Sequence, residues 1–580
     1  MQCSPSRRLG VWLFSAVVFG GCASQPPRPR PLPAPLPPAT APAPVQRPVP
    51  LPAPALVAPP AAVAPAPEPP AVAARFPDPP VSFQTPAFGP GHTGYTSNEE
   101  LQDFLRRLVH DGGPGPDATT VRLLEPGTSQ RGVPIEALLF TRDPDAAMAL
   151  PVRPTRPTVL LIGQQHGDEP AGSEALLAVA LELAHGRLAR VLDKLNVVIL
   201  PRANPDGAAA GTRSSASGID INRDQLLLRT PEAQAQAQLL RQYTPLVVVD
   251  AHEYPAVGRF VEKFRAAPSS DVLLQYATTA NLPEFLTKAA EEWFRRPLLA
   301  QLKTAGLSAD WYYTATPDLN DGKLAMGGPE PDSSRNVNGL RNAVSFLIET
   351  RGGGLGRAYF KRRVYAQVTA LGNLLESAAA RSADLVKLRQ FDDSEVASKA
   401  CQGDVVLQAN PTASEYRVTM LDRVTGADKA VTVAWDSTLE LETRKSRARP
   451  CGYWLAASET EAVTHLRGLG IQVQRVEEVG VVRGESYREV ARELVPPSDP
   501  TTGVTDAGGV VKVGVEVVPT LIDVPIGSYY VGLDQPLANL AVAALEPDTN
   551  HSYVAHRVVT ATQAEARLMA RPEMRMTALP

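Results

Sequence analysis

Short apolar runs alternate with amphipathic stretches through the middle of the chain. A short apolar run bounded by turn signals predicts a buried strand, whereas apolar residues spaced three and four apart predict a helix that packs by one face. Predicted strands are Val121–Leu124, Ile135–Phe140, Thr158–Gly163, Val197–Leu200, Leu246–Asp250 and Val344–Ile348. Predicted helices are Leu101–Val109, Pro170–His185, Pro231–Tyr243 and Ala358–Ser377. This alternation predicts an α/β fold with a mixed, mostly parallel sheet flanked by helices.

After residue 390 the apolar runs become shorter and more β-like. They comprise Val418–Leu421, Val431–Ala434, a βα-like unit at Gly452–Val473 and a tract rich in glycine and valine at Gly503–Val518. Such runs are typical of β-rich structure. We therefore expect residues 93–385 to form one α/β domain and residues 390–580 to form a β-rich α+β accessory domain behind it.

The first residues have the pattern of a targeting segment. Two arginines precede the apolar stretch Val11–Gly21, which is too short to span a bilayer. Small residues directly before Cys22 resemble the lipid-attachment site of bacterial lipoproteins. We expect residues 1–22 to be a lipoprotein-type signal peptide, and the exported protein to be anchored through Cys22 on the periplasmic side of the outer membrane. The alternative is an ordinary secretory signal, which would leave a soluble periplasmic or secreted protein.

Composition adds a linker and removes one class of partner. Residues 23–92 are dominated by Pro and Ala, which predicts an extended, disordered linker. The 580 residues are 44% hydrophobic with a net charge of −4, so the chain can bury a large core but has no basic excess for nucleic acid, and we expect no such partner. Beyond the leader only Cys401 and Cys451 remain. In an oxidising compartment these two form either a disulfide or two separate buried thiols.

Candidate chemistry follows three of the predicted strands. His166 and Glu169 come just after Thr158–Gly163, His252 follows Leu246–Asp250, and Glu349 follows the Val344 run. The carboxyl ends of parallel strands meet at one edge of an open sheet, where such folds bind ligands. Imidazole nitrogen and carboxylate oxygen are zinc ligands, and a catalytic zinc site takes three of them and leaves a fourth position open. A His-x-x-Glu motif alone is weak because it arises by chance in many chains.

Five blocks in order make the assignment specific. They are His166-Gly167-Asp168-Glu169, Asn204-Pro205-Asp206-Gly207, Arg213 with Gly218-Ile219-Asp220-Ile221-Asn222-Arg223, His252 and Glu349. Together they resemble the M14, carboxypeptidase A-like family of zinc metallocarboxypeptidases over roughly residues 93–378, which implies a zinc carboxypeptidase-like fold. The resemblance implies that His166, Glu169 and His252 bind one Zn²⁺ per chain. It also implies that Glu349 is the general base that takes a proton from the activated water.

The resemblance also assigns the substrate-binding residues. Arg213 resembles the arginine that stabilises the oxyanion, and Asn222 and Arg223 resemble the pair that binds the terminal carboxylate of the substrate. Asp250 precedes a predicted ligand by two residues and is a candidate hydrogen-bond partner for it. The chain departs from the family in having no clean match for the substrate-facing tyrosine, since Tyr312 and its neighbour lie rather far upstream of Glu349.

The sequence therefore predicts an exported zinc-dependent metallocarboxypeptidase that hydrolyses C-terminal peptide bonds of peptides or muropeptides. One alternative is a zinc deacylase of the aspartoacylase/succinylglutamate desuccinylase type, and another is a non-catalytic peptide-binding lipoprotein. The accessory domain and the linker favour a polymeric substrate outside the cytoplasm. The sequence leaves open the side-chain preference, the oligomeric state and the role of the C-terminal domain.

Overall fold

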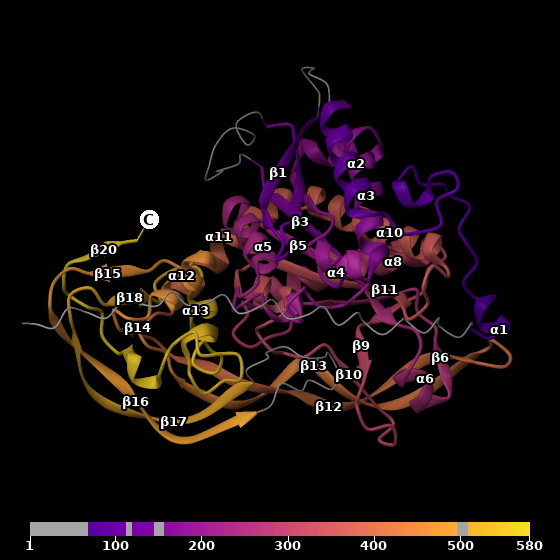
Figure 1. Cartoon of the computed structure of the whole chain (residues 1–580). Coiled ribbons are helices and arrows are strands. Elements are labelled where there is room, and N and C mark those ends of the chain that lie inside the picture. The colour runs from indigo at the N-terminus through magenta and orange to yellow at the C-terminus, as the bar shows by residue number, and fades with distance from the viewer. Residues whose placement is uncertain (1–67, 112–118, 144–155, 496–508, 580) are drawn as a thin grey trace, which may run out of the picture. The chain divides into compact units, whose positions relative to one another are not determined.

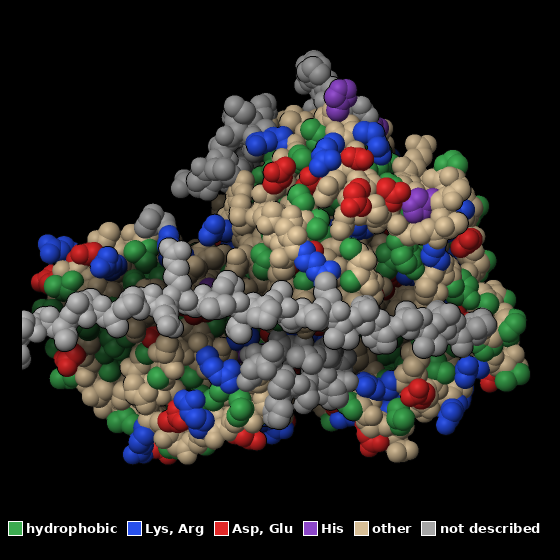
Figure 2. All heavy atoms as spheres, viewed as in Figure 1, with side chains coloured by type: hydrophobic (Ala, Val, Ile, Leu, Met, Phe, Trp, Pro, Cys, Tyr) green, Lys and Arg blue, Asp and Glu red, His purple; other side chains and the backbone are tan. Residues whose placement is uncertain are grey.

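The computed structural model describes residues 68–111, 119–143, 156–495 and 509–579, all within one compact unit, Ala64–Pro580. The expected signal peptide, Cys22 and most of the expected linker lie outside the described residues. The prediction that the linker extends to residue 92 was wrong, because residues 68–92 are folded: they contain α1 (Pro70–Ala73), and Val72 and Phe76 pack in a small apolar core. No helix in the described ranges is both long enough and apolar enough to cross a membrane. On the face shown in Figure 2, basic and acidic side chains are interspersed, in keeping with a net charge near zero.

An eight-stranded mixed sheet forms the centre of the α/β part (Figure 1). Its strands, in spatial order, are β1 (Thr120–Thr128), β2 (Pro134–Thr141), β4 (Asn196–Leu200), β3 (Thr158–Gly163), β5 (Val247–Pro255), β11 (Val344–Gly353), β7 (Val272–Tyr276) and β8 (Ala309–Trp311). The four adjacent strands β4, β3, β5 and β11 are parallel. At one side β1 and β2 are antiparallel to their neighbours, and at the other side β7 is antiparallel to β11 and parallel to β8. The predicted fold class is confirmed.

Helices cover both faces of this sheet because its central strands are apolar on both sides. Alternate residues of β3, such as Val159 and Leu161, pack in one core with helices α2 (Asn98–Asp111), α3 (Pro170–Ala184), α8 (Arg296–Thr304) and α10 (Phe360–Ala380). The residues between them, such as Leu160, pack on the other face with α5 (Pro231–Tyr243). Helix α2 begins with the expected capping box, in which Ser97 Oγ accepts from Glu100 N at 3.1 Å and Ser97 N donates to Glu100 Oε2 at 2.8 Å.

A second, five-stranded sheet joins the two halves of the chain. In spatial order it contains β6 (Ala266–Pro268), β12 (Asp404–Asp422), β13 (Asp428–Ala448), β10 (Lys323–Met326) and β9 (Tyr313–Ala315). The short runs predicted at Val418–Leu421 and Val431–Ala434 were wrong in extent, because they are pieces of a long hairpin whose strands are exposed or only partly buried at most other positions. The hairpin pairs with strands that precede residue 385, so the predicted domain boundary does not coincide with a boundary between sheets.

The last 130 or so residues form a seven-stranded sheet with two short helices, as predicted in kind. The strands, in spatial order, are β17 (Val510–Val524), β16 (Gly480–Val495), β19 (Glu565–Leu568), β14 (Gly452–Leu455), β18 (Tyr529–Gly532), β15 (Gln474–Val476) and β20 (Met576–Ala578), and the helices are α12 (Thr460–Gly468) and α13 (Ala538–Leu545). Cys401 and Cys451 form a disulfide with an S–S distance of 2.07 Å, which confirms the first of the two interpretations.

Helix α11 (Ser382–Ser398) connects the α/β part to the β-rich part and buries an acid. The Asp392 side chain is fully buried, and neither carboxylate oxygen has a hydrogen-bond partner. Burial, and then the neighbouring charges of Glu395 and Asp393, raise the pKa of Asp392 to about 7.

Candidate metal centre

Two neighbouring parallel strands and one helix start bring the predicted ligands together. His166 lies in the loop after β3, Glu169 is the N-cap residue of α3, and His252 lies on β5. Strands β3 and β5 are adjacent and parallel, so their carboxyl ends coincide. Glu349 on β11 stands directly beside His252 in the ladder of β5 and β11. The residues predicted at separate strand ends therefore lie together in one site.

The loop that carries His166 is held closely against the rest of the fold. A Cβ atom at Gly167 would lie 2.0 Å from the backbone carbon of Gly207, so only glycine allows this approach. Gly207 belongs to helix α4 (Pro205–Ala210), which the Asn204 side chain caps by accepting from Gly207 N at 2.8 Å. The Asn204–Gly207 block therefore buttresses the site without contributing a ligand.

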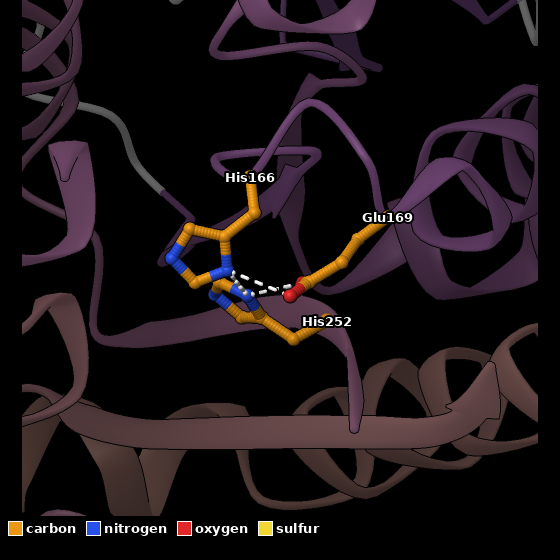
Figure 3. Close-up of side chains that lie close together, drawn as sticks. All are labelled: His166, Glu169 and His252. Carbon is orange, nitrogen blue, oxygen red and sulfur yellow. Dashed lines mark hydrogen bonds and ion pairs between the residues drawn. The ribbon is translucent and has the colours of Figure 1, made fainter. Parts of the chain in front are cut away.

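The three ligand atoms face one another at short range (Figure 3). His166 Nδ1 and His252 Nδ1 lie 2.8 Å from the two oxygens of Glu169 and 3.0 Å from each other. In the described part of the chain this is the one group of three or more such side chains whose ligand atoms all lie within 4.8 Å. All three residues are buried.

Two further carboxylates fix the orientation of the imidazoles. His166 Nε2 lies 3.1 Å from Asp220 Oδ1, and His252 Nε2 lies 2.9 Å from Asp250 Oδ2. A carboxylate accepts a hydrogen bond, so each Nε2 carries the proton and each Nδ1 turns a lone pair toward Glu169. Two lone pairs and a carboxylate that converge on one point are the kind of donor set that a bound cation satisfies. The residues present therefore fit a zinc ion with a His₂Glu ligand set.

The electrostatics agree with this fit. Burial alone would raise the pKa of Glu169, but the adjacent His166 and His252 hold that pKa well below its usual value. Burial alone would lower the pKa of His252, but Asp250 and Glu169 raise it well above the ordinary value. The site thus has an excess of negative charge that positive charge must balance. A metal ion supplies that charge in place of protons.

The centre opens into a cavity of about 840 Å³. Its lining includes His166, Glu169, Arg213, Asn222, Arg223, Tyr312, Arg335 and Glu349. Glu349 is 6% exposed, and burial followed by the charge of Glu169 raises its pKa to about 7. Arg213 donates to Asp220 Oδ2 through Nε at 3.1 Å and Nη2 at 2.9 Å, and its Nη1 lies 3.1 Å from His166 Nδ1.

The remaining predicted residues lie side by side next to the centre. Asn222 Nδ2 lies 3.2 Å from His252 Nε2, and Asn222 Oδ1 accepts from Ser334 N at 2.8 Å. Arg223 donates to the Asn222 carbonyl at 2.7 Å. Burial alone would lower the pKa of Arg223, but the charge of Asp332 raises it. Six of the seven predicted site residues therefore line one cavity, and the seventh, His252, is fully buried beside Glu169.

Comparison with known proteins gives the same picture. Residues 116–279 match the family model described as zinc carboxypeptidase. "Carboxypeptidase 2" of Trichophyton rubrum is 27% identical over 81% of this chain and 86% of its own length. Over most of its length the chain is therefore similar to zinc carboxypeptidases of the M14 type.

More distant relatives include human "Carboxypeptidase D", which is 34% identical over 24% of this zinc carboxypeptidase and 13% of its own length. Among solved structures, a metallo-carboxypeptidase from Pseudomonas aeruginosa in complex with (2-guanidinoethylmercapto)succinic acid is 22% identical, with a TM-score of 0.36 over 48% of this chain and 69% of that one. The match and the ligand cluster together indicate that the protein is a hydrolase whose cofactor is zinc.

Three residues of this zinc carboxypeptidase's site lay outside the sequence assignment. Tyr312 follows β8 and lines the cavity, and its buried hydroxyl has a raised pKa because of burial and then the charge of Glu349. Tyr312 could not be assigned from the sequence because it lies far before Glu349 along the chain. In the fold, β9, β10 and α9 (Ser334–Leu340) follow Tyr312 and bring the chain back to the same cavity. Asp220 belongs to the same sequence block as Asn222 and Arg223, but the sequence assigns it no role. Asp332 forms an ion pair with His551 at 3.3 Å, and both line the cavity, although sequence patterns place them in different domains.

Proposed function

We propose that this zinc carboxypeptidase removes the C-terminal residue of peptides or muropeptides. The observation that carries the proposal is a single cavity in which a buried His₂Glu centre, a carboxylate with a pKa near neutrality and two arginines face the same space. A peptidase that acts on chain ends needs all three: a means of activating water, a proton acceptor and a cation for the terminal carboxylate.

His166, Glu169 and His252 would hold the zinc ion, which when bound polarises a carbonyl and lowers the pKa of water to about 7. Glu349 would accept the proton of the attacking water and deliver it to the leaving amine. A base works best when its pKa lies near the working pH, and the raised pKa of Glu349 meets that requirement. The positive charge of a bound metal would offset part of this rise.

Arg213 would stabilise the negative charge that develops on the carbonyl oxygen. Its guanidinium is held by two bonds to Asp220, so it is positioned before the substrate arrives. Losing one such donor typically costs about 10²–10³ in turnover. Arg223 and Asn222 would bind the terminal carboxylate, and a planar guanidinium can grip it through two parallel bonds. Tyr312 would close the same side of the cavity.

We also propose that the protein is exported and held through Cys22 on the periplasmic side of the outer membrane. The sequence of residues 1–22 supports this, and the Cys401–Cys451 disulfide is in keeping with an oxidising compartment. Mass spectrometry of the mature N-terminus tests it. A diacylglyceryl Cys22 supports the anchor, whereas an unmodified N-terminus further along the chain supports a soluble periplasmic or secreted protein.

A peptide library read by mass spectrometry tests the activity. The purified, zinc-loaded full chain should give products that lack one or more C-terminal residues. The matched control is Glu349→Gln, which keeps the shape and the zinc ligands and should give no products. Release of acyl groups from N-acyl amino acids without such ladders would instead identify a deacylase, and no turnover of either class would leave a binding protein.

A further inference from the structure

We propose that Arg335 makes this carboxypeptidase selective for substrates whose C-terminal residue is acidic, by binding the side-chain carboxylate of aspartate or glutamate. The proposal rests on the proposed function. It concerns the enzyme's preference for the side chain of the substrate's C-terminal residue, which the sequence left open.

Arg335 is a buried cation in the wall of the catalytic cavity. It lies in the first turn of α9, is 4% exposed and lines the same cavity as Arg223, Tyr312 and Leu347. Leu347 is two residues before Glu349 on β11, and alternate residues of a strand share a face. The space in front of Arg335 is therefore the space in front of the general base.

The guanidinium of Arg335 has only neutral partners. Its Nη2 donates to the Gly328 carbonyl at 2.8 Å, and its Nε donates to Asn336 Oδ1 at 3.3 Å. Within the described ranges, no carboxylate oxygen lies within 4.0 Å of this guanidinium, so Arg335 forms no ion pair there. The exposed Glu330 and Asp332, which pairs with His551, attract it only from farther away.

The other buried arginines of the chain differ from Arg335 in their partners or in their position. Several are paired with carboxylates: Arg351 with Glu68, Arg363 with Glu253 and Arg567 with Glu546. Arg202, Arg341 and Arg449 also bond to neutral groups, but none of these lines the catalytic cavity. Arg335 combines both properties: it lacks a carboxylate partner and it faces the substrate space.

A cation in this position favours an incoming anion. Burial and the like charge of nearby Arg223 lower the pKa of Arg335 to about 10. Removing a charge from water is costly unless an opposite charge compensates, so a carboxylate from the substrate would be bound firmly. Gly327 makes room for the guanidinium, since a Cβ atom there would lie 2.5 Å from Arg335 Nη1, and the cavity that Arg335 lines offers the space for the carboxylate.

Two arginines in the wall of one cavity fit a residue with two carboxylates. Arg223 lies next to Asn222 and the metal centre, which suits the main-chain carboxylate beside the scissile bond. Arg335 lies on α9 and is bonded to the loop that carries Gly327 and Gly328, and Gln275 fixes that loop by accepting from Gly327 N at 2.9 Å. A terminal Asp or Glu presents both groups, whereas Gln or Leu presents only the first.

The test compares blocked dipeptides that differ only in the C-terminal residue: Glu, Gln, Leu and Lys. With the zinc-loaded full chain, kcat/KM for the Glu substrate should exceed that for Gln and Leu by about 10- to 100-fold, since one charge-assisted contact changes between them. Arg335→Met should remove this preference by lowering kcat/KM for the Glu substrate alone, and Arg335→Lys should retain part of it. Arg229→Met is the control, because Arg229 lines the cavity and donates to the His556 carbonyl, and it should leave the ratio unchanged.

The outcomes separate this inference from the proposed function. Cleavage of all four substrates at similar rates would overturn the role of Arg335 and leave the carboxypeptidase intact, whereas cleavage of none would overturn the proposed function. An equal loss for Glu and Leu substrates in Arg335→Met would show that Arg335 binds the main-chain carboxylate, which also overturns the inference. Calorimetry with Glu349→Gln gives a check that needs no turnover: N-acetyl-glutamate should bind more tightly than N-acetyl-glutamine, and equal affinities would contradict the proposal.

Discussion

Replacing Asp392 by Asn should stabilise the protein above neutral pH and leave it unchanged in acid. Burial raises the pKa of this carboxyl from 3.8 to about 7, so the folded protein binds the proton more tightly than the unfolded chain does. The folded state therefore becomes less stable as pH rises from about 4 through 7, while the carboxyl ionises without a hydrogen-bond partner. One pKa unit corresponds to about 1.4 kcal/mol, so the shift gives at most about 4 kcal/mol at pH 8.

Thermal unfolding of the zinc-loaded protein at pH 5 and pH 8 measures this difference. For a unit of this size, about 4 kcal/mol corresponds to a rise of several degrees in the Tm of Asp392→Asn at pH 8, and the rise should shrink toward zero at pH 5. The neighbouring Asp393→Asn is the matched control, because Asp393 accepts from Arg389 and Asn342 and should not become more stable at pH 8 when neutralised. The reasoning is refuted if the stabilisation is the same at both pH values, or if Asp392→Asn is the less stable protein at pH 8.

Three further substitutions probe the site and its support. Asp220→Asn should weaken zinc binding by about 10- to 100-fold, because the amide no longer fixes the proton on His166 Nε2; a chelator competition would contradict this if affinity were unchanged. Arg213→Met should lower kcat by about 10²–10³ with little change in KM, and steady-state kinetics that showed only a KM effect would exclude its role at the carbonyl oxygen. Arg363→Met should cost about 3–5 kcal/mol in denaturant unfolding because it leaves the buried Glu253 without its ion-pair partner, whereas Arg381→Met, which removes an exposed i,i+3 pair, should cost less than about 1 kcal/mol.

The central sheet could be predicted from the sequence because its strands are continuous apolar runs. Val159 and Leu160 face opposite cores, so both must be apolar, and the run is visible without knowledge of the fold. The candidate ligands were found for a related reason, since each directly follows or ends such a run. Where a strand is buried on both faces, its continuous apolar run in the sequence is enough to predict that it lies inside the sheet.

The parts that could not be predicted depend on contacts between distant segments. The arms of the β12–β13 hairpin are mostly exposed and polar, and their extent is set by pairing with each other and with β10. Tyr312 and Arg335 reach the cavity only because the hairpin, loop and short helix between β8 and β11 fold back over it. No spacing of residues in the sequence indicates that a segment folds back in this way. An arginine outside an apolar run gives the same sequence pattern whether its side chain is solvated or buried.

The ion pair between Asp332 and His551 connects the lining of the cavity to the β-rich part of the chain. Asp332 lies between β10 and α9, whereas His551 follows α13, and the two side chains are 3.3 Å apart on the cavity wall. The metal ligands come from the central sheet and its loops alone, but this stretch of wall forms only when both parts of the chain have folded together. Loss of the β-rich part would therefore remove part of the wall in front of the metal ligands without removing any ligand.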